Sequence, residues 1–210
     1  GFRKNLYLKR SDTSRKDEGT SRIKVNWQMT DNTKIKFLVS QVDLDDPADI
    51  WTIDGSLNTL SDRPGMDSQK TNSYGIKVFH SFDGYELQSF TSSTDTDVVF
   101  SYDADWGNTD SHFPYVYDYF SETLRDRRSF NQEFRIVSDS ADFLQDRFIE
   151  WVVGANYLEL KESNFKKDDG LYGDPTDPFG PYASASSSSS QYKSSNISVF
   201  GNLDYLLSAS

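Results

Sequence analysis

The sequence predicts an all-β protein whose antiparallel strands follow one another up and down. Apolar residues recur at every second position over most of the 210 residues, which is typical of strands with one apolar face. Aromatic residues make up 15% of the chain although the mean hydropathy is only -0.69, a combination that argues against disorder. Short turns also alternate with long polar connections along the chain.

The first hairpin is the clearest. The segment Phe2 to Lys9 is expected to supply an opening strand, although its alternation is weaker. From Arg22 to Thr30, apolar and polar side chains then take turns without interruption. The pair Asp31-Asn32 predicts a tight turn, and the alternation resumes from Lys34 to Val39.

The following segments repeat this design. Tyr74 to Val78 alternates, Asp83-Gly84 is a strong turn signal, and β-prone residues continue from Tyr85 to Tyr102. A longer turn is expected at Asp139–Arg147. The remaining strands are predicted at Ser129–Ser138, Phe148–Leu160 and Ile197–Leu206.

The lengths of the connections point to a membrane protein. Short turns are expected near 31–33, 83–84 and 139–147, and long polar loops near 10–19, 43–72, 103–128 and 161–195. Short connections at one end, long ones at the other and strands of about ten residues are typical of a transmembrane β-barrel, with short periplasmic turns and long extracellular loops. A soluble β-sandwich is the alternative, because alternation alone does not separate the two.

The barrel interpretation assigns each strand one side facing lipid and one facing a polar lumen. Lys24, Glu133, Arg135 and Asn156 are expected to face the lumen, where they line a ligand path or contact a plug. The residues expected to face lipid are Ile23, Val25, Trp27, Ile35, Phe37, Val39, Ile76, Val78, Phe134, Ile136, Trp151, Val153 and Tyr157.

Composition excludes several other classes of protein. The formal net charge of -11 disfavours a nucleic-acid-binding protein, which needs a basic surface. The absence of cysteine excludes disulfides and thiolate metal sites. No run of about 18 apolar residues is present, so no transmembrane helix is expected.

Several segments together resemble the barrel domain of TonB-dependent outer-membrane receptors. Ser129–Ser138 (SFNQEFRIVS) followed by Trp151–Tyr157 (WVVGANY) resembles a consecutive pair of strands in that family, with Phe134 and Ile136 in place of the two usual leucines. Val199–Tyr205 (VFGNLDY), Arg22–Trp27 (RIKVNW) and Leu87–Thr91 (LQSFT) are similar to other strands of the family, and they occur in the same order. The ordered set is more specific than any one motif.

The resemblance implies that the chain is part of a larger membrane protein. Barrels of this family have about 22 strands and a plugged lumen, whereas about eight strands are readable here. Residues 1–210 are therefore expected to be an early part of such a barrel, without the plug domain and the closing strand. A complete eight-stranded barrel is the alternative by strand count alone.

The implied function is transport rather than catalysis. The receptor would take up a scarce nutrient, such as a ferric siderophore, cobalamin or a glycan, across the outer membrane of a Gram-negative bacterium. Its implied partners are outer-membrane lipid, the small-molecule ligand and a TonB-type energy-transducing protein that acts through the plug. No enzymatic activity and no cofactor are implied, and nucleic acid is not among the partners.

The residues themselves give little support for chemistry. The two histidines, His80 and His112, lie in no zinc-binding pattern, and no serine lies in a nucleophile elbow. Two acidic runs have the oxygen-rich composition that calcium prefers, but neither matches a calcium-binding loop, so solvated loop charge is favoured. These runs are Asp43, Asp45, Asp46 and Asp49, and Asp103, Asp105 and Asn108.

Aromatic residues in the expected long loops are the best candidates for ligand contact. They are Trp51, Trp106, Tyr115, Tyr117 and Tyr119. Packing of these loops on themselves is an equally good interpretation. If the fold were a soluble, secreted β-sandwich instead, the same loops would serve to bind carbohydrate or another protein. A surface esterase or protease is a third possibility with no supporting motif.

Overall fold

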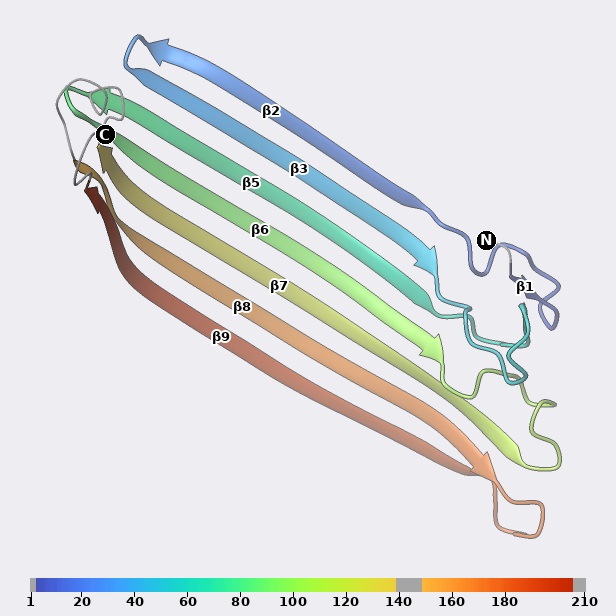
Figure 1. Ribbon diagram of the computed structural model, residues 1–210. Helices are drawn as coiled ribbons and strands as arrows, with labels where there is room; N and C mark the ends of the chain where they lie inside the picture. The colour runs from blue at the N-terminus through green and yellow to red at the C-terminus, as the bar shows by residue number, and fades with distance from the viewer. Residues whose placement is uncertain (1–2, 139–148, 206–210) are drawn as a thin grey trace.

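The computed structural model describes residues 3–138 and 149–205, and it consists of one long, curved antiparallel sheet (Figure 1). Seven strands pair in chain order, each with the next. They are β2 (Glu18–Thr30), β3 (Thr33–Pro47), β5 (Met66–Phe82), β6 (Tyr85–Asp103), β7 (Val116–Ser138), β8 (Ile149–Gly173) and β9 (Tyr182–Tyr205). The prediction of an all-β, antiparallel, up-and-down arrangement is thereby confirmed.

Two very short strands lie outside this sheet. β1 (Lys4–Asn5) and β4 (Asn58–Thr59) pair in parallel near the long-loop end. The strand expected over Phe2 to Lys9 was therefore wrong in extent, since only Lys4–Asn5 is strand and Phe2 lies outside the described residues. The reason is visible at Asn5, whose side-chain amide donates to the Asp49 carboxylate at 2.9 Å and to the Ser61 carbonyl oxygen at 2.8 Å. These bonds tie the segment to the loop after β3 instead of to β2.

The short turns lie where the sequence predicts them. Asp31-Asn32 connects β2 to β3, and Asp83-Gly84 connects β5 to β6, with Gly84 at a φ of 82°. A positive φ suits glycine, because other residues meet a steric clash there. The turn expected at Asp139–Arg147 lies outside the described residues, as do Phe148 and Leu206.

The long loops are shorter than expected, because the strands continue into them. The connections at this end are 48–65, 104–115 and 174–181, and the main strands have 13 to 25 residues instead of about ten. Polar residues sustain the extension by pairing across strands. Arg127 contacts the Glu162 carboxylate at 2.5 Å, and the Ser121 hydroxyl donates to Asp168 at 2.6 Å. Even the Ala/Ser-rich tract at 183–190 lies in β9, paired with β8.

The sheet is a single layer with two open faces. Among the described residues, Ala48 is the one buried hydrophobic residue. Trp27 and Phe134, which a sandwich would enclose, are 48% and 52% exposed. The described chain therefore lacks the stacked pair of sheets that the sandwich alternative requires. No helix in it is long and apolar enough to cross a bilayer.

Candidate functional site

One face of the sheet collects the apolar side chains. In the observed register, Trp27 pairs with Ile35, which pairs in turn with Val78. Because side chains alternate between faces along a strand, residues in register share a face. Every residue expected to face lipid lies on this side, which we call the apolar face. On β7, β8 and β9 the same row continues through Phe134, Ala155 and Val199.

The apolar face ends at a sharp boundary. Along β8 it runs from Ile149 to Tyr157, which is about 27 Å at roughly 3.4 Å per residue. A barrel in the outer membrane has an apolar band of about 25 Å. The second row beyond Tyr157 on this face is charged in four neighbouring strands. It consists of Asp95, Arg128, Lys161 and Lys193.

A few polar side chains interrupt the apolar face, and they bond to one another. The Thr91 hydroxyl donates to the Gln132 side-chain oxygen at 2.6 Å, and the Gln132 amide donates to the Ser89 hydroxyl at 3.1 Å. Hydrogen bonds between polar side chains lower the free-energy cost of placing these groups in apolar surroundings. The interruption is therefore compatible with the rest of the band.

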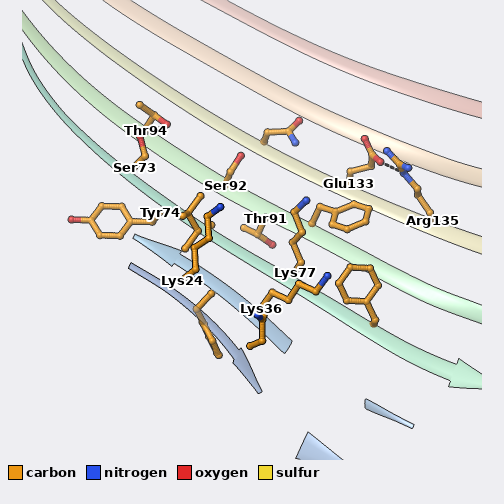
Figure 2. A pocket seen from close by; sticks show the side chains of 17 residues that line it. Lys24, Lys36, Ser73, Tyr74, Lys77, Thr91, Ser92, Thr94, Glu133 and Arg135 are labelled. Atoms are coloured by element: carbon orange, nitrogen blue, oxygen red, sulfur yellow. Dashed lines mark hydrogen bonds and ion pairs between the residues drawn. The ribbon is translucent and has the colours of Figure 1, made fainter. Parts of the chain in front are cut away.

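The opposite face carries cations and aromatic rings at the same height. Lys24 on β2, Lys36 on β3, Lys77 on β5 and Arg135 on β7 line one hollow of about 730 Å³. We call it the cationic hollow. Figure 2 shows the three lysine side chains next to one another, with Arg135 and Glu133 at the far side. Sequence analysis identified Lys24, Glu133 and Arg135 as lumen-facing residues, and the structure places all three here.

Lys36 and Lys77 also line this site, although they were not predicted as lumen-facing residues. Their only signal was their position on the polar side of an alternating strand. Aromatic rings hold both side chains: the Lys36 ammonium lies 4.9 Å from the centre of the Phe79 ring, and that of Lys77 lies 5.1 Å from Phe90. The Arg135 guanidinium also lies over Phe90, at 5.1 Å. Such cation–π contacts orient a cation without neutralising it.

The candidate ligand-contact aromatics do not converge on one site. Tyr117 and Tyr119 belong to β7 and not to a loop, and their ring centres lie 4.6 Å apart. Trp51 packs 5.1 Å from Tyr102 instead. Trp106 and Tyr115 are 43% and 47% exposed in the 104–115 connection. Ring packing near these loops therefore accounts for part of the expected set.

The candidate ligand-contact aromatics are also distant from the cationic hollow. Tyr119 and Glu133 lie on the same face of β7, fourteen positions apart, which is about 45 Å of strand. The two groups are separate sites at opposite ends of one face. An additional exposed ring, Phe179 at 84% exposure, lies in the 174–181 connection and was not singled out from sequence.

The second acidic run forms the turns of the 104–115 connection. An Asp103 oxygen accepts the backbone N–H groups of Asp105 and Trp106, both at 3.2 Å. The Asp105 carboxylate accepts the N–H groups of Gly107 at 2.9 Å and Tyr119 at 2.7 Å. Burial raises the pKa of Asp103 to about 7, and the carboxylates of Asp105 and Asp62 add to this effect. These oxygens of Asp103 and Asp105 therefore accept hydrogen bonds from the backbone of the connection and of β7.

The first acidic run does not gather around one point either. Asp43 and Asp46 lie on opposite faces of β3, because their positions differ by an odd number. Asp46 contacts the Lys16 ammonium at 2.5 Å, and Asp49 accepts a bond from the Thr59 hydroxyl at 2.7 Å. Over residues 3–138 and 149–205, no three acidic or histidine side chains are grouped so as to hold a metal ion.

The two histidines have ordinary neighbours. The His80 ring nitrogen lies 2.8 Å from the Thr33 hydroxyl at the short-turn end of the sheet. His112 lies 3.3 Å from the carbonyl oxygen of Asp105.

Comparisons with protein-family models, with curated proteins and with solved structures yield no match to this chain.

Proposed function

We propose that this chain forms part of the wall of an outer-membrane β-barrel that belongs to a TonB-dependent receptor. The receptor takes up a scarce nutrient, such as a ferric siderophore, and performs no chemistry on it. One observation carries the proposal above the others: the sheet is apolar on one face and cationic on the other at the same height. A wall between hydrocarbon and an aqueous lumen needs one apolar face and one polar face, and the cationic face meets the second requirement.

The motifs that resemble the receptor family support the same interpretation. Ser129–Ser138 and Trp151–Tyr157 are neighbours in the sheet, and Ile136 pairs with Val153 across them. Val199–Tyr205 pairs with the other side of β8. These three segments therefore form one continuous patch on the part of the sheet that carries the apolar band, whereas Arg22–Trp27 lies apart from them on β2.

The unpaired sheet edges also favour a larger assembly. Within the described residues, β2 and β9 each have one neighbouring strand, so each leaves a row of backbone N–H and C=O groups open. In a bilayer such groups cost several kcal/mol each unless a further strand pairs with them. The proposal therefore requires additional strands at both edges, supplied by a longer protein.

A pair of neighbouring substitutions tests the membrane wall. Val153 lies on the apolar face, and Val152 lies on the opposite face beside it. In the longer protein that supplies the edge strands, Val153→Arg should lower the free energy of unfolding from lipid vesicles by about 2–4 kcal/mol, because it places a charge against hydrocarbon. Val152→Arg is the matched control, and we expect a cost below about 1 kcal/mol, because its charge reaches water in the lumen.

Denaturant titration of each variant in phospholipid vesicles, followed by tryptophan fluorescence, measures both costs. Equal costs for the two substitutions would contradict the proposal. A larger cost for Val152→Arg would reverse the assignment of the two faces.

A further inference from the structure

Like charges oppose each other directly in the cationic hollow. Lys36 and Lys77 are cross-strand partners in the register of β3 and β5. Partners of this kind hold their Cβ atoms about 5 Å apart, and two like charges there destabilise a sheet. Lys24, whose partner is Leu38, lies diagonally next to Lys36 on the same face. Three lysine side chains therefore rise from neighbouring positions on one face of the sheet.

Among the described residues, these three lysines have no acidic partner, in contrast to the lysines in the outer part of β8. Lys161 lies 2.7 Å from the Glu159 carboxylate, and Lys167 lies 2.6 Å from that of Asp169. For Lys24, Lys36 and Lys77, the described residues supply no carboxylate oxygen within 4.0 Å of the ammonium nitrogen. In a chain of net charge -11, an unneutralised group of cations is unexpected.

The other members of the hollow leave this positive charge in place. Glu133 forms an ion pair with Arg135, so the two cancel. The rings of Phe79 and Phe90 lie against Lys36 and Lys77, so they orient those two side chains while their N–H donors stay available. The hollow thus carries about three uncompensated positive charges, in a volume of about 730 Å³ that suits a small solute.

We infer that the cationic hollow is a binding site for a small polyvalent oxyanion, a solute that carries several carboxylate or phosphate groups. Such an anion accepts charge-assisted hydrogen bonds from Lys24, Lys36 and Lys77 at once, and it removes the repulsion between them. A monovalent anion compensates only one of the three positive charges. Binding requires only the folded sheet, whereas a role of this site on the uptake path rests on the proposed function.

Protection of lysines from acylation tests the site in the full chain, folded in zwitterionic detergent. The probes are tricarballylate, a trivalent carboxylate, and pyrophosphate, with acetate as the monovalent reference. Mass spectrometry reads the labelling of each lysine. At least one polyvalent probe should protect Lys36 and Lys77 at concentrations where acetate does not. Lys161 and Lys167, which already have acidic partners, should label equally with and without probe.

Substitution then separates binding from a structural role. Lys36→Gln should weaken binding of the protecting probe about tenfold, the loss expected for one charge-assisted hydrogen bond. It should leave the unliganded chain as stable or more stable, because it removes a like-charge pair. Lys161→Gln is the control and should leave the affinity unchanged.

Absence of selective protection by both probes overturns the inference, as does equal affinity in Lys36→Gln and Lys161→Gln. A loss of folding in unliganded Lys36→Gln also overturns it, because the lysine would then be structural. The outcome is distinguishable from failure of the proposed function. Probe binding with equal costs for Val153→Arg and Val152→Arg would retain the anion site and reject the membrane wall.

Discussion

Asp103 shows how a single buried carboxyl group makes one loop sensitive to pH. Its pKa in the folded protein is about 7, compared with about 3.9 for an unfolded chain, because burial disfavours the charged form. Between these two values the folded state holds the proton more tightly than the unfolded state. Stability therefore falls as pH rises from about 4 to about 7, and it levels off above that.

The fall of stability with rising pH gives a testable prediction for the 104–115 connection. Hydrogen exchange of its amides should become faster between pH 5 and pH 8, after correction for intrinsic rates, because ionised Asp103 faces the carboxylates of Asp105 and Asp62. In Asp103→Asn the corrected rates should not change with pH, because the amide keeps an acceptor oxygen and does not ionise.

Asp174 provides the control for this measurement. It lies in another connection, where the backbone N–H of Thr176 bonds to its carboxylate at 2.8 Å and lowers its pKa. Asp174→Asn should leave the pH dependence of the 104–115 amides intact. A pH dependence that persists in Asp103→Asn would assign the effect to another group.

The long hairpins are the elements that extend the sheet beyond its apolar band. Their outer parts carry many charged and polar side chains beside a few apolar ones, such as the row Val99, Leu124 and Phe165, so cross-strand contacts add to backbone pairing there. Glu159 illustrates this, because it contacts Lys161 at 2.7 Å on its own strand and Lys193 at 3.4 Å on β9. Exposed pairs of this kind contribute little individually, so the extension depends on their number.

The turn between β5 and β6 gives a prediction at the scale of one element. Gly84 has a φ of 82°, so Gly84→Ala should destabilise the sheet by about 1–2 kcal/mol in denaturant titration, the cost of a left-handed conformation for an L-residue. Gly75 lies within β5, and an added Cβ there meets no atom closer than 3.6 Å. Gly75→Ala should therefore cost nothing. Equal costs at the two glycines would reject the assigned turn.

Sequence predicted the elements wherever the signal was local. Asp31-Asn32 and Asp83-Gly84 carry their turn chemistry in two adjacent residues, and the period of two places Trp27 and Val153 on one face. The outer halves of β8 and β9 escaped prediction, because the Ala/Ser-rich tract at 183–190 has no apolar pattern and its order comes from pairing with β8. The pairing partners lie in the preceding strand, across the 174–181 connection, so the composition of the tract itself does not report them.

The candidate site was predictable to a similar degree. The polar side of each strand was evident, and so were Lys24 and Arg135 as members of it. The opposition of Lys36 and Lys77 was not, because it depends on the register between β3 and β5 across an 18-residue connection, 48–65. The loop aromatics were identified by type, but sequence gave no sign that Trp51 packs on Tyr102.

At the scale of the whole molecule, the sheet is a wall with two different sides and two open edges. Residues 3–138 and 149–205 enclose no core between two layers, so the apolar face is left open and favours a partner that covers it. In the proposed membrane wall, a bilayer covers this face along about 27 Å of the tilted strand β8. The cationic side then faces water, where its charges are inexpensive.

The tryptophans provide the most direct test of this account. Two of the four, Trp27 and Trp151, lie on the apolar face, whereas Trp51 and Trp106 lie in the long connections. Four single-tryptophan variants, with the other positions changed to Phe, would be folded into vesicles of lipids brominated along their acyl chains. Brominated chains should quench Trp27 and Trp151 strongly and leave Trp51 and Trp106 bright. Equal quenching of all four, or no quenching of Trp27 and Trp151, would contradict the membrane wall.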